Sequence, residues 1–564
     1  MLIFLLACVS GNTQNSSYWL FAYKIVLVLS CTTFILTRKN FAFNYFELFC
    51  TCVIFLIALS SRIFDLELLN YLLFIFVLYV ALKLLFSQGS IQQIEFFLLN
   101  IFSLLLFSLF AFSIYIFYNY DEPSNIFFSI NSSIFSIVLA SLISFVLPLI
   151  IKIKTSLFYK TLYFISLFTA VLLMASTNGR TGWLCCIITG LFIGYQYLQK
   201  KEHKNFVLLF NAGLIILVFS LLFFYKSGSS NGRLLIQKIS FRLFKENWLV
   251  GIGQGQFRVQ YNLAQAKYFS TNDIDGVEAL LADNTFYAFN DYFEFIIEHG
   301  MLGFLVIVFF IFFYVRLLKN VFVNNENKSL FIAAQSCLLC IFIACFFSYS
   351  LKNFPTVFLL LICFSIIASL PQKIPLNYNL KIRGHSVFKI FCFIVAIFLS
   401  FYYFYSFFYE LKIKEAYELK QVGFKTKSLT EYKKINGSYI KNGPALYNYA
   451  EELFNVNKLE EAKVVVNALK KMYTANDIYI LSANIEAELK NIAKAEQDYK
   501  TAIFMVPNRM VSRKKLLDFY IQQKDTIPAI FWAKSIINMP VKVRSNITES
   551  IQVKTKLILS GLLK

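Results

Sequence analysis

Long runs of apolar residues restrict the possible folds of this sequence more than any other feature. Each run approaches the roughly 20 residues that a helix needs to cross about 30 Å of hydrocarbon. Because the bilayer core offers the backbone no hydrogen-bonding partner, runs of this length predict transmembrane helices. The runs cover residues 18–36, 41–59, 66–87, 93–118, 126–151, 157–175, 182–199, 206–225, 293–318, 329–350, 354–370 and 387–408.

The composition supports this interpretation. The 564 residues are 58% hydrophobic and only 15% charged, which is typical of a polytopic membrane protein. We therefore predict an all-α fold built on a transmembrane bundle of about 12 helices. The opening MLIFLLACVS is apolar but too short to span comfortably and lacks a basic start, so we expect a clipped first helix or a start site placed too late.

Two stretches are too polar for a bilayer and divide the chain. The first follows residue 225, and the second begins near Lys412, where Lys, Glu, Ala and Asn become frequent. These changes predict four parts with different environments. The parts are N-terminal transmembrane helices at 1–225, an extracytoplasmic loop at 226–292, C-terminal transmembrane helices at 293–409 and helical repeats at 410–564.

The charges of the loops predict the orientation in the membrane. Basic loops face the cytoplasm, so the alternate loops, the 226–292 loop and everything after Phe408 are expected outside. The net charge of +21 is explained by cytoplasmic loops and anionic headgroups rather than by nucleic acid. The basic loops are residues 38–40, 152–160, 200–204, 316–328 and 372–385, and the acidic one is 119–125.

The C-terminal part contains a repeat. Ala450 and Ala462 recur as Ala483 and Ala495, a shift of thirty-three residues, and Pro507 closes the second unit. This pattern resembles tetratricopeptide repeats, in which small residues let paired helices pack closely. A more degraded third unit follows around Leu517 and Ala529. The resemblance implies a scaffold for a protein partner rather than a catalytic domain.

A cluster of cations opens the 226–292 loop. Arg233, Arg242 and Lys245 are nine and three residues apart, and we expect them roughly on one side of a helix. Arginine presents a rigid fork of donors that matches phosphate, so the array suits an anion with several oxygens. The alternative is a solvated basic helix.

Three glycines follow this cluster. Gly251, Gly253 and Gly255 would let backbone N–H groups approach a ligand, or would simply form a flexible turn. Because no strand precedes them, a dinucleotide fold is not expected.

Arg180 is expected on the same side of the membrane as these cations. It lies between Gly179 and Gly182 at the outer end of a helix. There it either anchors the helix by reaching toward the headgroups or joins Arg233 and Arg242 in one anion site.

A metal site is not expected. The chain has three histidines, and its eleven cysteines lie mostly within apolar runs, where they serve as packing residues. Asp273 and Asp275 have the spacing with which some glycosyltransferases hold a divalent ion, but such acidic triplets are common in polar loops. No cofactor is predicted.

Three stretches resemble the O-antigen ligase and polymerase superfamily of bacterial envelope enzymes. They are residues 176–183, GRLLIQKISFRLFKENWLVGIGQGQF and FNDYFEFIIEHGMLG, within residues 160–310. The resemblance implies an inner-membrane glycosyltransferase of polysaccharide or lipopolysaccharide biosynthesis. It would pass a glycan from undecaprenyl diphosphate to an acceptor hydroxyl on the periplasmic side, without metal. Arg180, Arg233 and Arg242 would hold the diphosphate, and the glycine turn would shape the site.

The acceptor side departs from the family pattern. Many ligases have a His-Asn pair where this chain has Phe289 and Asn290, so the usual candidate base is absent. Asn290 stays a candidate catalytic residue. Asp291 or Glu294 would then take the acceptor proton, or the arginines alone would promote departure of the diphosphate. A catalytically inactive homologue is the third alternative. His299 lies too far along the helix to substitute.

Two classes of function remain open. The first is glycan transfer, with a growing glycan, the lipid A core or a protein as acceptor. The second is a transporter or flippase for a lipid-linked or anionic solute, which would also need arginines and many helices. A transporter is expected to place polar or broken helices at mid-membrane, whereas runs such as 93–118 and 387–408 are almost wholly apolar. The sequence therefore favours the enzyme.

Overall fold

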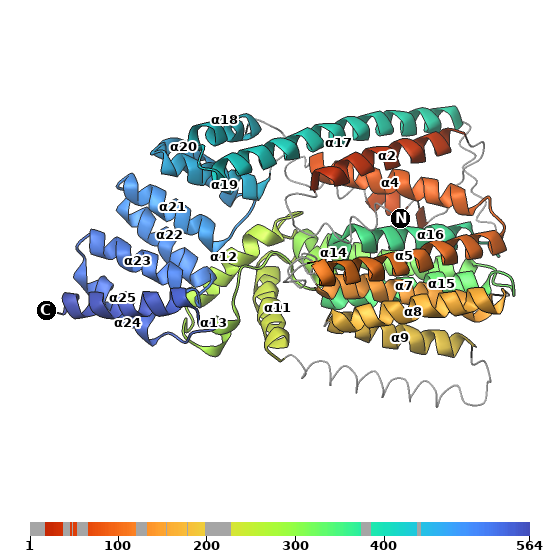
Figure 1. The fold of residues 1–564 in the computed structure, drawn as a ribbon, viewed down its shortest axis with the longest axis horizontal. Coiled ribbons are helices and arrows are strands. Elements are labelled where there is room, and N and C mark those ends of the chain that lie inside the picture. Colours follow the sequence, from red (N-terminus) through yellow and green to blue (C-terminus); the bar gives the residue numbers. More distant parts are fainter. Residues whose placement is uncertain are drawn as a thin grey trace. The chain divides into compact units, whose positions relative to one another are not determined.

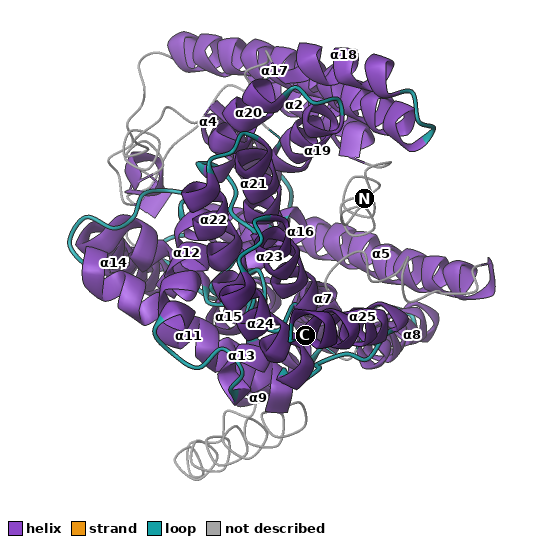
Figure 2. Cartoon of the chain, turned by 90° about the vertical axis from the view of Figure 1, so that its left-hand side faces the viewer, coloured by secondary structure: helices purple, strands orange, loops and turns teal. Residues whose placement is uncertain are grey.

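The computed structural model describes residues 17–37, 46–47, 49–53, 66–119, 132–153, 155–177, 179–197, 227–373, 385–436 and 442–563. Within these ranges the chain is helical, and its β pairing is limited to an isolated bridge between Val321 and Gln372. Figures 1 and 2 show helices joined by turns and loops. The predicted all-α class is confirmed.

The chain divides into two compact units that interleave along the sequence. The first comprises residues 1–225, 289–293 and 304–411, and the second comprises 226–288, 294–303 and 412–564. Residues 294–303, which follow the first three residues of one long helix, therefore group with the polar loop rather than with the membrane helices.

The first unit contains the apolar helices. Seven helices in the described ranges are long and apolar enough to cross a membrane: α4, α5, α7, α8, α14, α15 and α17. Their neighbours α2 and α16 are shorter as apolar segments, and α9, predicted as a span at 182–199, is not among the seven. The helices are α2 (Ser17–Leu36), α4 (Leu66–Phe86), α5 (Ile91–Asn119), α7 (Ser132–Lys152), α8 (Leu157–Ser176), α9 (Arg180–Tyr197), α14 (Asp291–Asn320), α15 (Lys328–Phe347), η2 (Ser350–Lys352), α16 (Phe354–Ser369) and α17 (His385–Gln421).

Several predicted features lie outside the described residues. They are the opening residues 1–10, the span at 206–225, most of the span at 41–59, most of the loop at 372–385, and the loops at 38–40, 200–204 and 119–125, apart from Asn119. The predicted span at 387–408 is the first part of α17, which continues to Gln421.

Helix α7 is the centre of the first unit. It packs against α15, α9 and α8, and most of its residues are buried. Hydroxyl groups join these helices, since the Ser144 hydroxyl lies 2.7 Å from that of Thr189 and Ser336 donates to the Ser144 carbonyl at 2.6 Å. Small residues let the helices approach closely, as is usual where lipid gives helices no hydrophobic reason to associate. Cys337 and Cys340 are buried here without a disulfide, in keeping with a packing role.

The second unit combines the polar loop with the C-terminal helices. The loop forms α11 (Ser227–Asn247), α12 (Phe257–Ser270) and α13 (Val277–Leu281). The C-terminal helices are α18 (Lys425–Asn436), α19 (Gly443–Asn455), α20 (Leu459–Lys470), α21 (Asn476–Glu488), α22 (Ile492–Met505), α23 (Met510–Gln522), α24 (Thr526–Asn538) and α25 (Asn546–Leu562).

The repeat is visible in the backbone. Gly423, Asn457, Lys490 and Lys524 have positive φ angles of 89°, 62°, 60° and 59°. They are 34, 33 and 34 residues apart, and each ends the first helix of a hairpin. The first hairpin therefore begins in α17, before the repeat that the alanines predict. Ala450, Ala462, Ala483 and Ala495 are all fully buried. Membership of the tetratricopeptide family stays a prediction.

Two side chains of α12 join the polar loop to the repeats and to itself. The amide of Asn262 donates to the Thr474 carbonyl at 2.7 Å and accepts from the Thr285 N–H at 2.9 Å. Gln265 donates to the carbonyl of Asp283 at 3.1 Å. Both α12 side chains are fully buried, so these hydrogen bonds are shielded from water.

Two residues of the repeats bind the loop from the other side. The Asn508 amide lies 2.9 and 2.7 Å from the carbonyls of Ala279 and Ala282. The buried guanidinium of Arg513 donates to the Ile274 carbonyl at 3.0 Å. The scaffold predicted for a partner thus contacts a segment of its own chain.

Glu486 makes the stability of this unit depend on pH. Burial raises the pKa of its carboxyl, but hydrogen bonds from Lys494, Asn491 and Lys463 outweigh burial and hold that pKa at about 2. Because the folded-state pKa lies below the unfolded value, the contribution is complete above the unfolded pKa and is lost as pH falls from there toward 2. We expect a loss on the order of 3 kcal/mol over this range.

Denaturant unfolding of the detergent-solubilised protein at successive pH values tests this. Glu486→Gln is the comparison, because glutamine removes the titrating group. The variant should start less stable at neutral pH and lose less between pH 4.5 and 2. Equal pH slopes for the two proteins would contradict the assignment.

Candidate functional site

Helix α11 carries four cations of the loop, between residues 233 and 245. The apolar residues that it buries recur every four positions and are Leu235, Ile239 and Leu243. Arg233 and Arg242 are nine residues apart, which is two and a half helical turns. They therefore leave the helix on opposite sides, and the expectation of one shared side was wrong. Arg242 and Lys245, three residues apart, do share a side.

Arg242 belongs to a cluster that links α11 to α12 and α13. Its guanidinium carbon lies 4.6 Å from the centre of the Tyr268 ring. Lys238 donates to Glu278 at 2.7 Å, and the Tyr268 hydroxyl donates to the same carboxylate. These two hydrogen bonds hold the pKa of Glu278 below its usual value, and the charge of Arg242 adds to the effect.

The stacking leaves the donors of Arg242 available. Its side chain is exposed, and it makes no hydrogen bond to the part of the chain that the structure describes. A guanidinium that lies over an aromatic ring without hydrogen bonds to protein keeps its N–H donors for an anion. Arg242 is therefore oriented by Tyr268 and able to bind two oxygens of a phosphate.

The glycine turn after α11 closes on the chain itself. The Ile252 N–H donates to the Ile297 carbonyl at 3.0 Å, and the Gly253 N–H donates to the Glu298 carbonyl at 2.9 Å. From the other side, the Met301 N–H donates to the Leu249 carbonyl at 3.2 Å. The turn and residues 297–301 are thus joined by three backbone hydrogen bonds. We call this pairing the glycine clasp.

The clasp requires glycine on both sides. A Cβ on Gly251 would lie 2.3 Å from the Glu298 carbonyl oxygen, and one on Gly300 would lie 2.5 Å from that of Leu249. Both residues also have positive φ angles, 78° and 60°. Gly300 interrupts the helical geometry of α14 at this point. Gly251 is therefore approached closely by the backbone of Glu298, on the side where its Cβ would lie.

Gly253 and Gly255 are different. Their φ angles of 103° and 69° again favour glycine, but no backbone lies within 4 Å of either Cβ position. A ligand can approach their main chain from this open side. These two remain the glycines for which ligand contact is predicted.

The acids of α14 each accept a backbone N–H from another segment. Asp291 accepts from Leu351 at 3.1 Å in the first unit. In the second unit, Glu294 accepts from Ala288 at 2.8 Å, and Glu298 accepts from the first residue of α12 at 3.2 Å. All three are buried. They therefore fix the chain around the start of α14, whatever else they do.

Asn290 caps the same helix. Its side-chain oxygen accepts from the Phe293 N–H at 3.0 Å, as expected of an N-cap asparagine. The N-cap of α14 is therefore Asn290, the residue before Asp291. A catalytic role of Asn290, Asp291 or Glu294 stays a prediction.

Phe289 is held in a conformation that phenylalanine rarely adopts. Its φ angle is 53°, and its ring meets the ring of Tyr349 edge to face at 5.5 Å. A left-handed bulky residue costs roughly 1–3 kcal/mol, and such strain concentrates at functional sites. The position that carries histidine in many ligases is therefore strained here, directly before the cap and Asp291.

Arg233, Arg242, the clasp and the start of α14 all lie between residues 233 and 301. Residues 164–308 match the family model described as O-antigen ligase. The chain contains an O-antigen ligase domain. The predicted resemblance is thus confirmed at the level of the family. A comparison with curated proteins finds no match.

Arg180 begins helix α9 of the ligase domain and belongs to the first unit. Its flanking glycines have a packing role, since a Cβ on Gly179 or Gly182 would lie within 2.1 or 2.6 Å of Ser136. They let α9 start against α7. A site that Arg180 shares with Arg233 and Arg242 stays a prediction.

The acidic pair of the ligase domain has a structural role. Asp273 accepts the N–H of Asp275 at 2.9 Å, and Asp275 forms an ion pair with the buried Arg513 at 2.8 Å. Among the described residues, no three His, Cys, Asp or Glu side chains gather where they could hold a metal ion. The carboxylate of Asp275 is thus engaged by a cation of the repeats.

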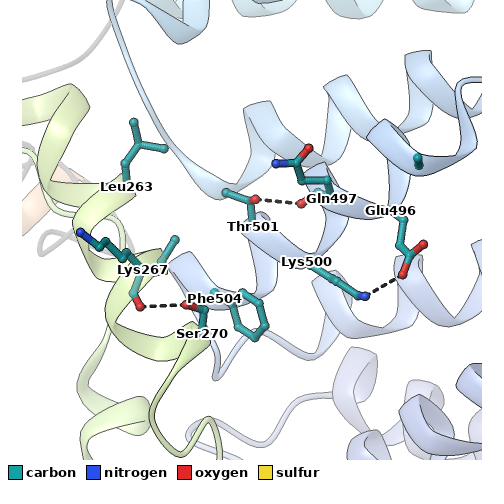
Figure 3. A pocket seen from close by; sticks show the side chains of 10 residues that line it. Leu263, Lys267, Ser270, Glu496, Gln497, Lys500, Thr501 and Phe504 are labelled. Carbon is teal, nitrogen blue, oxygen red and sulfur yellow. Dashed lines mark hydrogen bonds and ion pairs between the residues drawn. The ribbon is translucent and has the colours of Figure 1, made fainter.

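One hollow in the second unit lies between α12 of the ligase domain and α22 of the repeats (Figure 3). Its volume is about 550 Å³. Lys500 donates to Glu496 at 2.6 Å along one wall, and the Phe504 ring forms part of the lining. The residues predicted to bind donor or acceptor do not line it.

The sequence did not single out Tyr268, although it orients Arg242. A weak signal exists, because Lys238 and Arg242 are four residues apart and are therefore neighbours on the helix surface. One side chain from another segment can contact both. Nothing in the spacing identifies which tyrosine supplies it. Glu298 lies two residues before Gly300, where α14 departs from helical geometry. A glycine inside a long helical pattern is a sequence signal that draws attention to this position.

Proposed function

We propose that this protein transfers a glycan from a lipid-linked diphosphate, of the undecaprenyl type, to an acceptor hydroxyl outside the cytoplasmic membrane. The O-antigen ligase domain carries the proposal, because it supports glycan transfer at the level of the family. The exposed guanidinium of Arg242, stacked on Tyr268 with its donors unused, supports an anionic donor group.

The chemistry assigns a role to each charged group. The acceptor oxygen forms a bond to the anomeric carbon of the donor sugar while the bond from that carbon to the diphosphate breaks. The diphosphate leaves with the electron pair, and arginines stabilise the charge that develops on it. Arg233 and Arg242 are proposed for this task, together with Arg180. The acceptor's proton passes to Asp291, with Glu294 as the alternative base.

A deletion strain tests the function as a whole. We expect the strain to accumulate the lipid-linked glycan and to lose one class of glycosylated product. Comparing glycan chain length, lipid A linkage and protein glycosylation identifies the acceptor. If all three are unchanged and no lipid-linked glycan accumulates, the protein does not transfer glycans. The membrane face on which the lipid-linked glycan accumulates distinguishes a flippase. Loss of a flippase would leave this intermediate on the cytoplasmic face.

Arg242→Lys tests the donor site. Lysine keeps the charge but cannot form two parallel hydrogen bonds to phosphate or stack in the same way. We expect the turnover of purified protein with its lipid-linked donor to fall about 100-fold, the effect of removing one well-placed donor to a developing anion.

Arg258→Lys is the matched control, since Arg258 is also exposed and follows the glycine turn on α12. Its turnover should change little. If both variants keep the turnover of the unmodified protein, Arg242 does not bind the diphosphate.

Asp291→Asn tests the acceptor side. Asparagine retains an oxygen that can accept the Leu351 N–H, so folding should be preserved. The variant lacks a group that takes up a proton, and we expect turnover to fall by 100-fold or more, as when a general base is removed. Protein amount and donor binding should stay normal. Unchanged turnover would exclude Asp291 as the base.

A further inference from the structure

Helix α11 exposes large apolar side chains on the face opposite its buried one. Leu234, Phe241 and Trp248 are seven residues apart, so the helical positions share one face, and Trp248 directly follows the end of the helix. About half of each side chain is exposed, 51%, 48% and 54% respectively. Leu249 and Val250, the next residues, are exposed as well. We call these five residues the apolar stripe.

Cations accompany the stripe. Arg233 and Arg242 leave α11 on opposite sides, roughly a quarter turn to either side of Leu234 and Phe241. The ammonium of Lys245 lies 4.8 Å from the centre of the Phe241 ring, within the stripe itself. From Arg233 to Asn247 the helix has four cations against one acid, Glu246. The exposed face is therefore both apolar and strongly basic.

This combination matches the chemistry of a membrane surface. Tryptophan and other aromatic residues favour the boundary between acyl chains and headgroups, and long basic side chains reach from there to lipid phosphates. A protein partner would need acidic groups interspersed with apolar pockets. An anionic bilayer offers both features continuously, with phosphates above hydrocarbon.

The position of α11 in the chain points the same way. Residues 206–225 are predicted from the sequence to span the membrane, and α11 begins at Ser227. Two residues extend no more than about 7 Å. A helix joined so closely to a span starts near the headgroups. The buried residues Leu235, Ile239 and Leu243 hold its other face on the protein.

We propose that α11 lies in the surface of the bilayer, with the apolar stripe at the boundary of headgroups and acyl chains and its cations on anionic lipid phosphates. The proposal stands whether or not the protein transfers glycans. If it does, α11 places Arg233 and Arg242 at the depth of a lipid-borne diphosphate.

The experiment uses the full-length protein in nanodiscs of phosphatidylcholine, with or without phosphatidylglycerol. The photo-reactive residue p-benzoylphenylalanine replaces Phe241 or Trp248, and mass spectrometry identifies what it captures. Phe531 on α24 is the matched control, because it is also an exposed phenylalanine of the second unit, 61% exposed. All three sites are exposed, so the substitutions should not affect folding.

We expect lipid adducts at positions 241 and 248 at several times the level at 531. Phosphatidylglycerol should be enriched among them by about fivefold, the factor for one Lys or Arg at an anionic surface, and Lys245→Gln should remove much of this enrichment. Lipid adducts no more frequent than at 531 would overturn the proposal. Capture of another protein or of a second copy of this chain would also overturn it, and adducts without enrichment would refute the anionic preference.

Discussion

Gly251→Ala is expected to disrupt the second unit. The added methyl group would lie 2.3 Å from the Glu298 carbonyl oxygen, and a backbone carbonyl cannot move aside as a flexible side chain can. The φ angle of 78° adds a cost of about 1–2 kcal/mol for any residue with a Cβ. We expect a total loss above 3 kcal/mol, with low protein levels in membranes and rapid proteolysis of the loop.

Two other glycines separate these causes. Gly253→Ala has the unfavourable φ of 103° without a clash with backbone, so it should cost about 1–2 kcal/mol. Gly232→Ala lies within α11 with nothing near its Cβ and should stabilise the helix by up to about 1 kcal/mol. Thermal unfolding should give the lowest midpoint for Gly251→Ala, a higher one for Gly253→Ala and the highest for Gly232→Ala. Equal stability of the 251 and 232 variants would show that the clasp does not form.

Arg513→Met is expected to release the loop from the repeats. The guanidinium is fully buried and binds Asp275, the Ile274 carbonyl and the Ser535 hydroxyl. Methionine fills similar space but leaves these groups without their donor. The Asp275 carboxylate is 43% exposed and can be solvated, so the loss comes mainly from the hydrogen bonds of the buried guanidinium. A hydrogen bond from a charged donor contributes about 1.5–3 kcal/mol, so limited proteolysis should cut near residues 271–288 faster.

Arg509→Met is the control. Arg509 pairs with Asp283 at 3.2 Å and Asp477 at 3.3 Å, but all three side chains are well exposed. An exposed pair contributes about 1 kcal/mol or less, so the loop should remain protected. If both variants are cut equally fast, the buried cation does not anchor the loop.

The sequence predicted the helical class and most of the apolar helices because their signal is local. A run of some 20 apolar residues has few alternatives to a helix in lipid. Apolar content is a weaker guide to where a helix ends. Helix α17 continues well past the predicted end of its span, since its later turns pack in the repeats.

The site was less predictable, because its contacts join residues far apart in the chain. No local pattern indicates that Gly251 lies against Gly300 or that Tyr268 supports Arg242. The alanine spacing predicted the repeats but not that they bind the polar loop. The side chains that join the two are asparagine, glutamine and arginine, and they bind main-chain carbonyls, which every residue possesses. The sides of α11 from which Arg233 and Arg242 leave were predictable from 3.6 residues per turn. Nine residues make two and a half turns, so the two arginines should have been assigned to opposite sides.

The way in which the repeats hold residues 274–282 leaves the side chains of exposed positions such as Val277 free to vary. Asn508 and Arg513 bind carbonyls of Ile274, Ala279 and Ala282, so the path of the segment is set by its backbone. Val277 projects from it with 79% of its side chain exposed. Mutations at such positions alter the surface that the segment offers while its course stays fixed. The segment can therefore diversify like an antigen-binding loop on a constant framework, and it is a natural position for grafting new recognition sequences.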